Sequence, residues 1–183
     1  MNWYRLFISA ALVVVLAWVC SQRIDELLYH FSNQKILQLG DVTRLLPDVK
    51  LPTERYVELT GVIGNKGALI TGVRPGSFRL GPIQVRHLLG SQIFIEYDQN
   101  KLNSQLPTFS RVTLSGRLVD FGPKSELWQV RNFFSGRLSM KISPDARLLI
   151  VDEKPWDMWR YPLLFLLCAA LALGSIWMAI RKL

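Results

Sequence analysis

Residues 161–180 read YPLLFLLCAALALGSIWMAI and contain no charged side chain. A helix rises about 1.5 Å per residue, so roughly 20 mainly apolar residues cross a hydrocarbon core of about 30 Å. This segment meets that length, and residues 3–21, WYRLFISAALVVVLAWVCS, meet it near the start of the chain. The sequence therefore predicts a protein tethered to the bilayer by two transmembrane helices, with a domain between them.

About 140 residues, 22–160, lie between the two predicted spans, which is enough for one domain with its own core. The formal net charge is +8, but most basic residues are scattered singly among acidic ones. No run of lysine and arginine has the density of a nucleic-acid-binding arm, so nucleic acid is not an expected partner. The basic surface either attracts anionic lipid headgroups or an acidic partner, or is an ordinary solvated surface.

Strand signals dominate between residues 56 and 151. Residues 56–63 alternate apolar and polar side chains, and residues 68–74 follow after Gly-Asn-Lys-Gly, which predicts a hairpin. The further predicted strands are residues 78–80, 83–88, 93–97, 112–121, 127–134 and 147–151. Six or seven short antiparallel strands predict a small barrel or sandwich, either OB-like or a split barrel. The predicted fold class is a membrane protein with a mainly β soluble domain between two transmembrane helices.

One sequence pattern occurs twice within the predicted strands. VELTGVI at residues 57–63 resembles VTLSGRL at residues 112–118. Glycine inside a strand usually marks a bulge or a bend. The two runs favour a curved, partly closed sheet; chance similarity between two amphipathic strands is the alternative.

The first helix is expected to continue past the membrane as a stalk to about residue 36. Ile24, Leu27, Leu28 and Phe31 recur at helical spacing, and this stripe packs on the domain, on lipid headgroups or on a partner helix. A connector follows, with a helical turn at residues 41–46 for which Asp41 is a suitable N-cap. The β-rich domain is assigned to residues 37–154, and a second helical turn to residues 100–105.

Aromatic residues flank both predicted spans, and such rings settle at the headgroup level. The predicted interface residues are Trp3, Tyr4, Trp156, Trp159 and Tyr161, and residues 155–160 form an aromatic collar before the second span. Small residues in the second span permit close packing against the first span or another protein, or the face simply contacts lipid. The candidate packing residues are Cys168, Gly174 and Ser175.

Motifs of catalysis are absent from the sequence. The two histidines, His30 and His87, have no nearby thiolates or spaced carboxylates that would complete a metal site. The two cysteines, Cys20 and Cys168, lie in or beside the spans, so the middle domain holds no disulfide. We expect no enzyme activity, no catalytic residue, no metal and no cofactor; a membrane-embedded enzyme is the least favoured alternative.

The orientation prediction depends on the residues beside the second span. Arg181 and Lys182 follow it, whereas Asp152, Glu153 and Asp157 dilute the basic residues before it. The positive-inside rule then places both termini in the cytoplasm or matrix and the β-domain on the opposite side of a cell inner or mitochondrial inner membrane. The first segment is interpreted as a retained anchor rather than a cleaved signal.

The order of these elements resembles the Surf-one (Surfeit-locus) family of cytochrome c oxidase assembly factors. The resemblance lies in a first span, the runs at residues 57–63, 68–74 and 93–97, a proline-marked loop at 106–107, the run at 112–118 and a closing span. Two features depart from the family. Glu96-Tyr97-Asp98 stands where the family has an R-G-W-like element, and the second span lacks the histidine that the family links to haem handling. The resemblance implies an assembly or accessory role at a membrane complex, without a haem role.

Two functions therefore remain open. The first is a non-enzymatic, double-anchored assembly factor or accessory subunit of a larger membrane complex, with a respiratory oxidase as the candidate. Its expected partners are an integral membrane complex and the lipid bilayer. The alternative is a membrane-tethered barrel that binds a lipid or small ligand. The sequence does not indicate an oligomeric state.

Overall fold

A computed structural model describes residues 3–45, 51–71, 81–100, 106–125 and 127–181. The chain divides into two compact units. The helical unit comprises Met1–Ser32 and Pro155–Leu183, and the strand unit comprises Asn33–Lys154. The predicted strand at residues 78–80, the end of the one at 68–74 and most of the helical turn at 100–105 lie outside the described residues.

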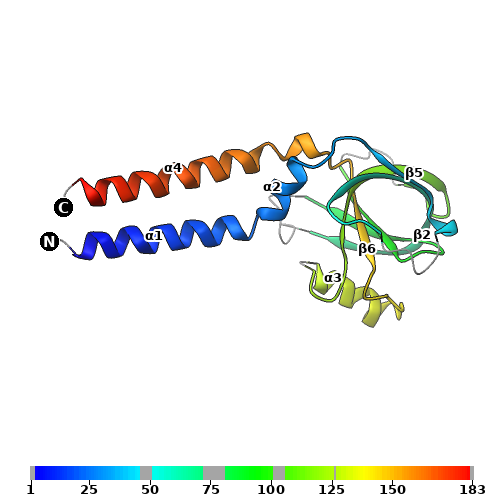
Figure 1. The fold of residues 1–183 in the computed structure, drawn as a ribbon. Coiled ribbons are helices and arrows are strands. Elements are labelled where there is room, and N and C mark those ends of the chain that lie inside the picture. Colours follow the sequence, from blue (N-terminus) through cyan, green and yellow to red (C-terminus); the bar gives the residue numbers. More distant parts are fainter. Residues whose placement is uncertain (1–2, 46–50, 72–80, 101–105, 126, 182–183) are drawn as a thin grey trace. The chain divides into compact units, whose positions relative to one another are not determined.

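The helical unit pairs two long apolar helices side by side (Figure 1). Its elements are α1 (Trp3–Ser21), α2 (Ile24–His30), the 3-10 turn η3 (Pro155–Met158) and α4 (Arg160–Ile180). By length and composition alone, the stretch Pro155–Met178 can cross a membrane. Residues 7–21 pass the same test only together with α2, across a bend of 56°. The described residues thus provide one helix suited to a span, or two if the bent pair counts as one.

The predicted uninterrupted helix to residue 36 is wrong. The helix ends at Ser21, whose hydroxyl donates to the carbonyl of Trp18 at 2.7 Å, while the Arg23 amide bonds three residues back to Cys20. Side-chain competition for a backbone carbonyl and a tightened last turn are both recognised causes of helix bending. After α2, the chain leaves the helical conformation and enters a strand at Leu37.

The described residues of the strand unit form a mixed six-stranded sheet whose hydrogen bonding closes into a ring. Strand β2 pairs with β3, β3 with β4, β4 with β6, β6 with β5, and β5 again with β2, while β1 adds to β2 as the sixth strand. The strands are β1 (Leu37–Asp41), β2 (Arg55–Ile70), β3 (Ile83–Leu88), β4 (Ile93–Asp98), β5 (Arg111–Asp120) and β6 (Arg147–Val151). The prediction of a purely antiparallel sheet is wrong, because β1–β2 and β4–β6 are parallel pairs.

The hairpin predicted around residues 64–67 is one continuous strand instead. β2 runs for 16 residues through these positions, with a register shift between Ile63 and Gly67. The first half of β2 pairs with β5 and the second half with β3. Two different partners hold the two halves, and the glycines accommodate a bulge where a tight turn was expected.

The repeated glycine pattern marks a close approach between strands. The two similar runs pair with each other, with Val57 opposite Gly116 and Gly61 opposite Val112. A Cβ added at Gly116 would overlap the carbonyl group of Ile150 on β6, with 2.8 Å between the added Cβ and the Ile150 carbonyl carbon. Gly116 therefore lets β6 approach β5 more closely than any larger residue permits.

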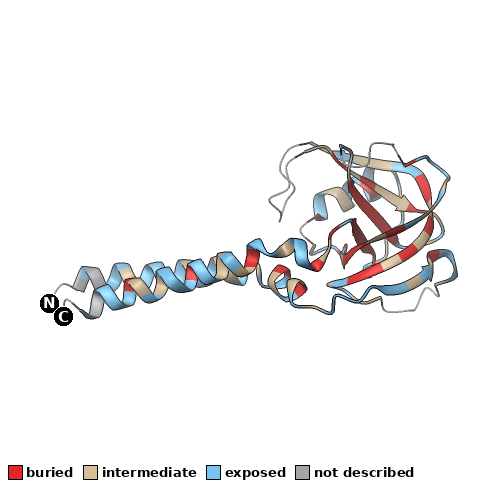
Figure 2. Cartoon of the chain, turned by 90° about the horizontal axis from the view of Figure 1, so that it is seen from above, coloured by how far each residue is buried: buried red, intermediate tan, exposed pale blue. Residues whose placement is uncertain are grey.

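Two apolar clusters stabilise the strand unit, and Figure 2 shows buried residues concentrated along the strands. The first fills the ring and includes Leu59, Ile95 and Leu149. The second packs Phe94 and Phe121 on the outside of the sheet against Phe134. Phe134 belongs to the π-helical segment η2 (Phe133–Arg137), which follows the helix α3 (Trp128–Asn132).

The strand predicted at residues 127–134 is therefore helical. Leu127 and Phe134 are buried seven residues apart, which fits a helical period, while Trp128 and Phe133 are exposed. The Arg131 guanidinium fixes the segment by donating to the carbonyls of Phe121, Ile142 and Ser143 at 2.8–3.0 Å.

The segment that follows α2 contains two short elements, of which the sequence predicted one. Strand β1 was not predicted. The 3-10 turn η1 (Val42–Arg44) was predicted, and its N-cap is confirmed: the Asp41 carboxylate accepts the Thr43 amide at 3.0 Å. The hydrogen bond from the Thr43 hydroxyl, followed by that from the Thr43 amide, lowers the pKa of Asp41.

Candidate functional site

The α1–α4 pair exposes apolar side chains outward and buries small residues between the helices. Cys168 and Ser175 are buried, and the Ser9 hydroxyl donates to the Ser175 carbonyl at 3.2 Å. The Ser175 hydroxyl donates to the Ala172 carbonyl at 2.8 Å, so it is satisfied within its own helix. Gly174 is half-buried, and a Cβ added there meets nothing within 4 Å. The packing thus uses Ser9 and Ser175 and does not require a glycine at 174.

The predicted interface aromatics differ in exposure. Tyr4, Trp156 and Trp159 are exposed, as rings at a headgroup level would be. Tyr161 is buried within the unit. The side chain of Trp3 lies outside the described part of the chain.

Helix α2 has one face held by the helical unit and one apolar face left uncovered. Glu26 and Tyr29 are buried, whereas Ile24, Leu28 and Phe31 are 49, 59 and 71% exposed. His30 Nδ1 lies 3.0 Å from the carbonyl oxygen of Pro155, and this hydrogen bond joins α2 to η3. His30 therefore has a structural partner in the chain, and the exposed stripe is presented at a fixed position within the helical unit.

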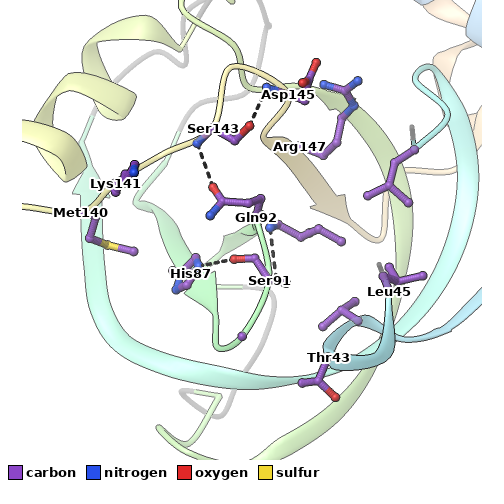
Figure 3. Close-up of a pocket in the computed structure, with 14 residues that line it drawn as sticks. Thr43, Leu45, His87, Ser91, Gln92, Met140, Lys141, Ser143, Asp145 and Arg147 are labelled. Carbon is purple, nitrogen blue, oxygen red and sulfur yellow. Dashed lines mark hydrogen bonds between the residues drawn. The ribbon is translucent and has the colours of Figure 1, made fainter. Parts of the chain in front are cut away.

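The strand unit contains a cavity of about 530 Å³ (Figure 3). One wall is apolar and comes from the η1 region, with Val42, Leu45 and Leu51. The opposite walls come from the β3–β4 turn and from the segment before β6, and carry mostly polar side chains. An apolar cavity with a few convergent polar groups is the usual form of a small-molecule site.

The polar walls are fixed by hydrogen bonds between distant segments. The Gln92 side-chain oxygen accepts the Ser143 amide at 2.9 Å, and the Gln92 carbonyl accepts the Arg147 amide at 3.0 Å. His87 Nε2 lies 2.8 Å from the Ser91 carbonyl. Burial lowers the pKa of His87, a charge on Lys66 adds to this effect, and the hydrogen bond to Ser91 opposes it. His87 is thus neutral at pH 7, with Nε2 as donor and Nδ1 as acceptor.

Arg147 contributes a buried cation to the lining. The residue is 6% exposed, and its Nη1 lies 2.9 Å from the Asp120 carboxylate. Its Nε is buried without a hydrogen-bond partner among the described residues. Lys141 and Asp145 are exposed at the cavity margin and add one charge of each sign. Sequence reasoning did not identify Gln92, Lys141, Ser143 or Arg147, because these residues form no local motif.

A second buried cation, Arg117, has a different role. It forms ion pairs with Glu54 and with Glu153, the latter at 3.1 Å. Burial alone would lower the pKa of Arg117, but the charges of Glu54 and Glu153 raise it above its ordinary value. These pairs join the start of β2, the middle of β5 and the end of β6, so we assign the cluster to stability.

Within the described residues, histidine, cysteine, aspartate and glutamate do not gather into any group of three that could hold a metal ion. His87 meets Phe94 with the ring centroids 5.0 Å apart, and so takes part in the aromatic packing outside the sheet. Comparisons of the chain with protein-family models, with curated proteins and with solved structures found no match.

Proposed function

We propose that this chain is a non-enzymatic, double-anchored membrane protein that serves as an assembly factor or accessory subunit of a larger membrane complex. The observation that carries this proposal is the exposed apolar stripe formed by Ile24 and Leu28 on α2 and by Phe31 directly after it, beside helices suited to a membrane. An apolar face that is held by its own unit and left uncovered is typical of an interaction surface.

The stripe is best suited to a helix of an integral membrane partner. Its members recur at i, i+4 and i+7, the spacing by which a helix presents one face to a neighbour. Glu26 and Arg23, which form an ion pair at 3.3 Å, lie off the stripe and remain compatible with the headgroup region. The resemblance to Surf-one assembly factors favours a respiratory oxidase as the complex.

The finer fold and location belong to the same proposal. We propose a small OB-like barrel with β1 added to it, and the ring-like order of β2, β3, β4, β6 and β5 supports this assignment. We assign the protein to a cell inner or mitochondrial inner membrane, with the termini in the cytoplasm or matrix and the barrel opposite. An engineered cysteine at the exposed Lys124, in a chain whose own cysteines are replaced, tests the orientation by its reaction with a membrane-impermeant maleimide.

Site-specific photocrosslinking in native membranes tests the partner. A photoreactive residue at Leu28 is expected to capture one defined integral membrane protein, while the same residue at Lys124 does not. Removal of the chain should lower the amount of assembled oxidase, measured from the haem difference spectrum of the membranes. Unchanged oxidase together with lipid-only crosslinks at Leu28 would refute the proposal.

The cavity favours a second function, that of a membrane-tethered module that binds a small ligand. Its volume lies within the range of roughly 300–1,000 Å³ that is usual for ligand sites. Native mass spectrometry of the gently solubilised chain is the direct test. A retained molecule of defined mass supports this function, and an empty protein with normal partner capture favours the first.

A further inference from the structure

We infer that the cavity of the strand unit binds a small amphiphile with an apolar body and an anionic head, either a carboxylate or a phosphate monoester. This inference deepens the second proposed function and is independent of the first. It rests on the separation of apolar and polar walls and on hydrogen-bond donors that the fold leaves unused.

The apolar wall accounts for the body of the ligand. Val42 is buried in the ring core, and Leu45 and Leu51 pack against that core while lining the cavity. Ile93 and Met140 extend the apolar surface from the other side. A cavity of about 530 Å³ has a volume that is usual for small-molecule sites.

The polar wall accounts for the head. The Gln92 oxygen is occupied by the Ser143 amide, so its NH₂ group is the part that can serve a ligand. Arg147 lines the cavity and adds positive charge to this wall, while its guanidinium is held by the ion pair with Asp120. Lys141 adds an ammonium at the margin. The neutral donor of Gln92 and the cationic donor of Lys141, beside the charge of Arg147, match the acceptor oxygens of a carboxylate or phosphate.

The other charged and titratable groups near the cavity do not reverse its preference for an anionic head. Asp145 is exposed at the margin, and Asp120 is already paired with Arg147. His87 is neutral, so it adds no charge to the lining.

Photoaffinity labelling of the full chain in phosphatidylcholine nanodiscs tests the inference. The probes are a decanoic acid that carries a diazirine, the phosphate monoester of the same chain, and the matching alcohol as the uncharged control. We expect the acid or the phosphate to label cavity residues such as Leu45 and Met140, mapped by mass spectrometry, at least about fivefold more than the alcohol.

Two variants and a matched control make the result specific. Gln92→Glu keeps an oxygen for the Ser143 amide but replaces the NH₂ donor with a negative charge, and should reduce cavity labelling at least about fivefold. Lys141→Gln, at an exposed site, should reduce the labelling of cavity residues by a smaller factor and should leave the fold unchanged. Lys124→Gln removes an exposed lysine outside the lining and should leave labelling unchanged.

Equal labelling by acid, phosphate and alcohol would overturn the anionic preference. Labelling confined to α1 and α4 would show partition into the bilayer and would overturn the site itself. If neither Gln92→Glu nor Lys141→Gln changes the labelling, then the side chains of Gln92 and Lys141 do not donate hydrogen bonds to the ligand head. Capture of a protein partner at Leu28 is measured separately, so failure of the ligand inference leaves the first proposed function standing.

Discussion

Substitution of Gly116 by alanine should destabilise the strand unit by about 3–5 kcal/mol. The added Cβ would overlap the Ile150 carbonyl, lying 2.8 Å from its carbon and 3.1 Å from Cα of Val151. Unstrained carbon contacts are about 3.5–4.0 Å, so β5 and β6 must move apart by about 0.7 Å or more. Backbone atoms cannot rotate away as the end of a flexible side chain does.

The magnitude follows from what the separation disrupts. Gly116 pairs with Val151, and the neighbouring pairs continue to Asp120 opposite Arg147. Overpacking in a well-packed site costs about 1–3 kcal/mol, and two weakened ladder bonds add about 1 kcal/mol each. For a domain of this size, that loss corresponds to a fall in melting temperature of roughly 10 °C or more.

Thermal unfolding of the full chain, followed by far-ultraviolet circular dichroism, measures the change, and hydrogen exchange of peptides from β5 and β6 localises it. Gly136→Ala is the matched control, because a Cβ at Gly136 meets nothing within 4 Å. If Gly116→Ala melts within about 2 °C of the wild type and hydrogen exchange in β6 is unchanged, the result refutes a close approach of β5 and β6 at Gly116.

Three further predictions concern ionic and polar contacts. Arg117→Ala leaves the carboxylates of Glu54 and Glu153 without their buried cation and should cost about 3–5 kcal/mol in urea unfolding. The pKa of His87 is lower in the folded chain than in the unfolded chain, so as pH falls His87 is protonated in the unfolded chain before it is in the folded one. Stability should therefore fall as pH drops below about 6.5, and His87→Gln should flatten that part of the pH profile of melting temperature. Ser9→Ala should weaken α1–α4 association by about 0.6 kcal/mol, measured for the helical unit in bicelles by steric trapping.

Each of these predictions has an outcome that contradicts it. A cost below about 1 kcal/mol for Arg117→Ala would mean that the ion pairs are solvated in solution. A pH profile that is the same with and without His87 would place the titration at another group. For Ser9, the isosteric Ser9→Cys variant is the control, and equal association of all three proteins would show that the hydrogen bond contributes nothing.

The sequence predicted the features that depend on local pattern. The apolar helices, most strands and the N-cap at Asp41 follow from hydrophobic periodicity and capping chemistry, which act within a few residues. The curved sheet was indicated by the glycines of the repeated pattern, and Gly116 does face a neighbouring strand at close range. These features need no knowledge of distant parts of the chain.

The remaining features depend on contacts between distant segments. Gly64 to Gly67 resembles a turn, yet pairing with β3 on one side and β5 on the other draws it into a continuous strand. The segment 127–134 is rich in strand-forming residues, but burial of Phe134 against Phe94 selects a helix. The cavity depends on contacts such as Gln92 with Ser143, 51 residues apart, which no local pattern records.

The hydrogen bond between His30 and Pro155 joins residues that are 125 positions apart. In topological terms, the whole strand unit is an insertion between two adjacent points of a helical hairpin. Because the entropic cost of closing a flexible loop grows only logarithmically with its length, an insert of this size is tolerated, and once folded it brings its own ends together. The strand unit can therefore be exchanged for another module with adjacent termini, while α1 and α4 of the helical hairpin stay paired.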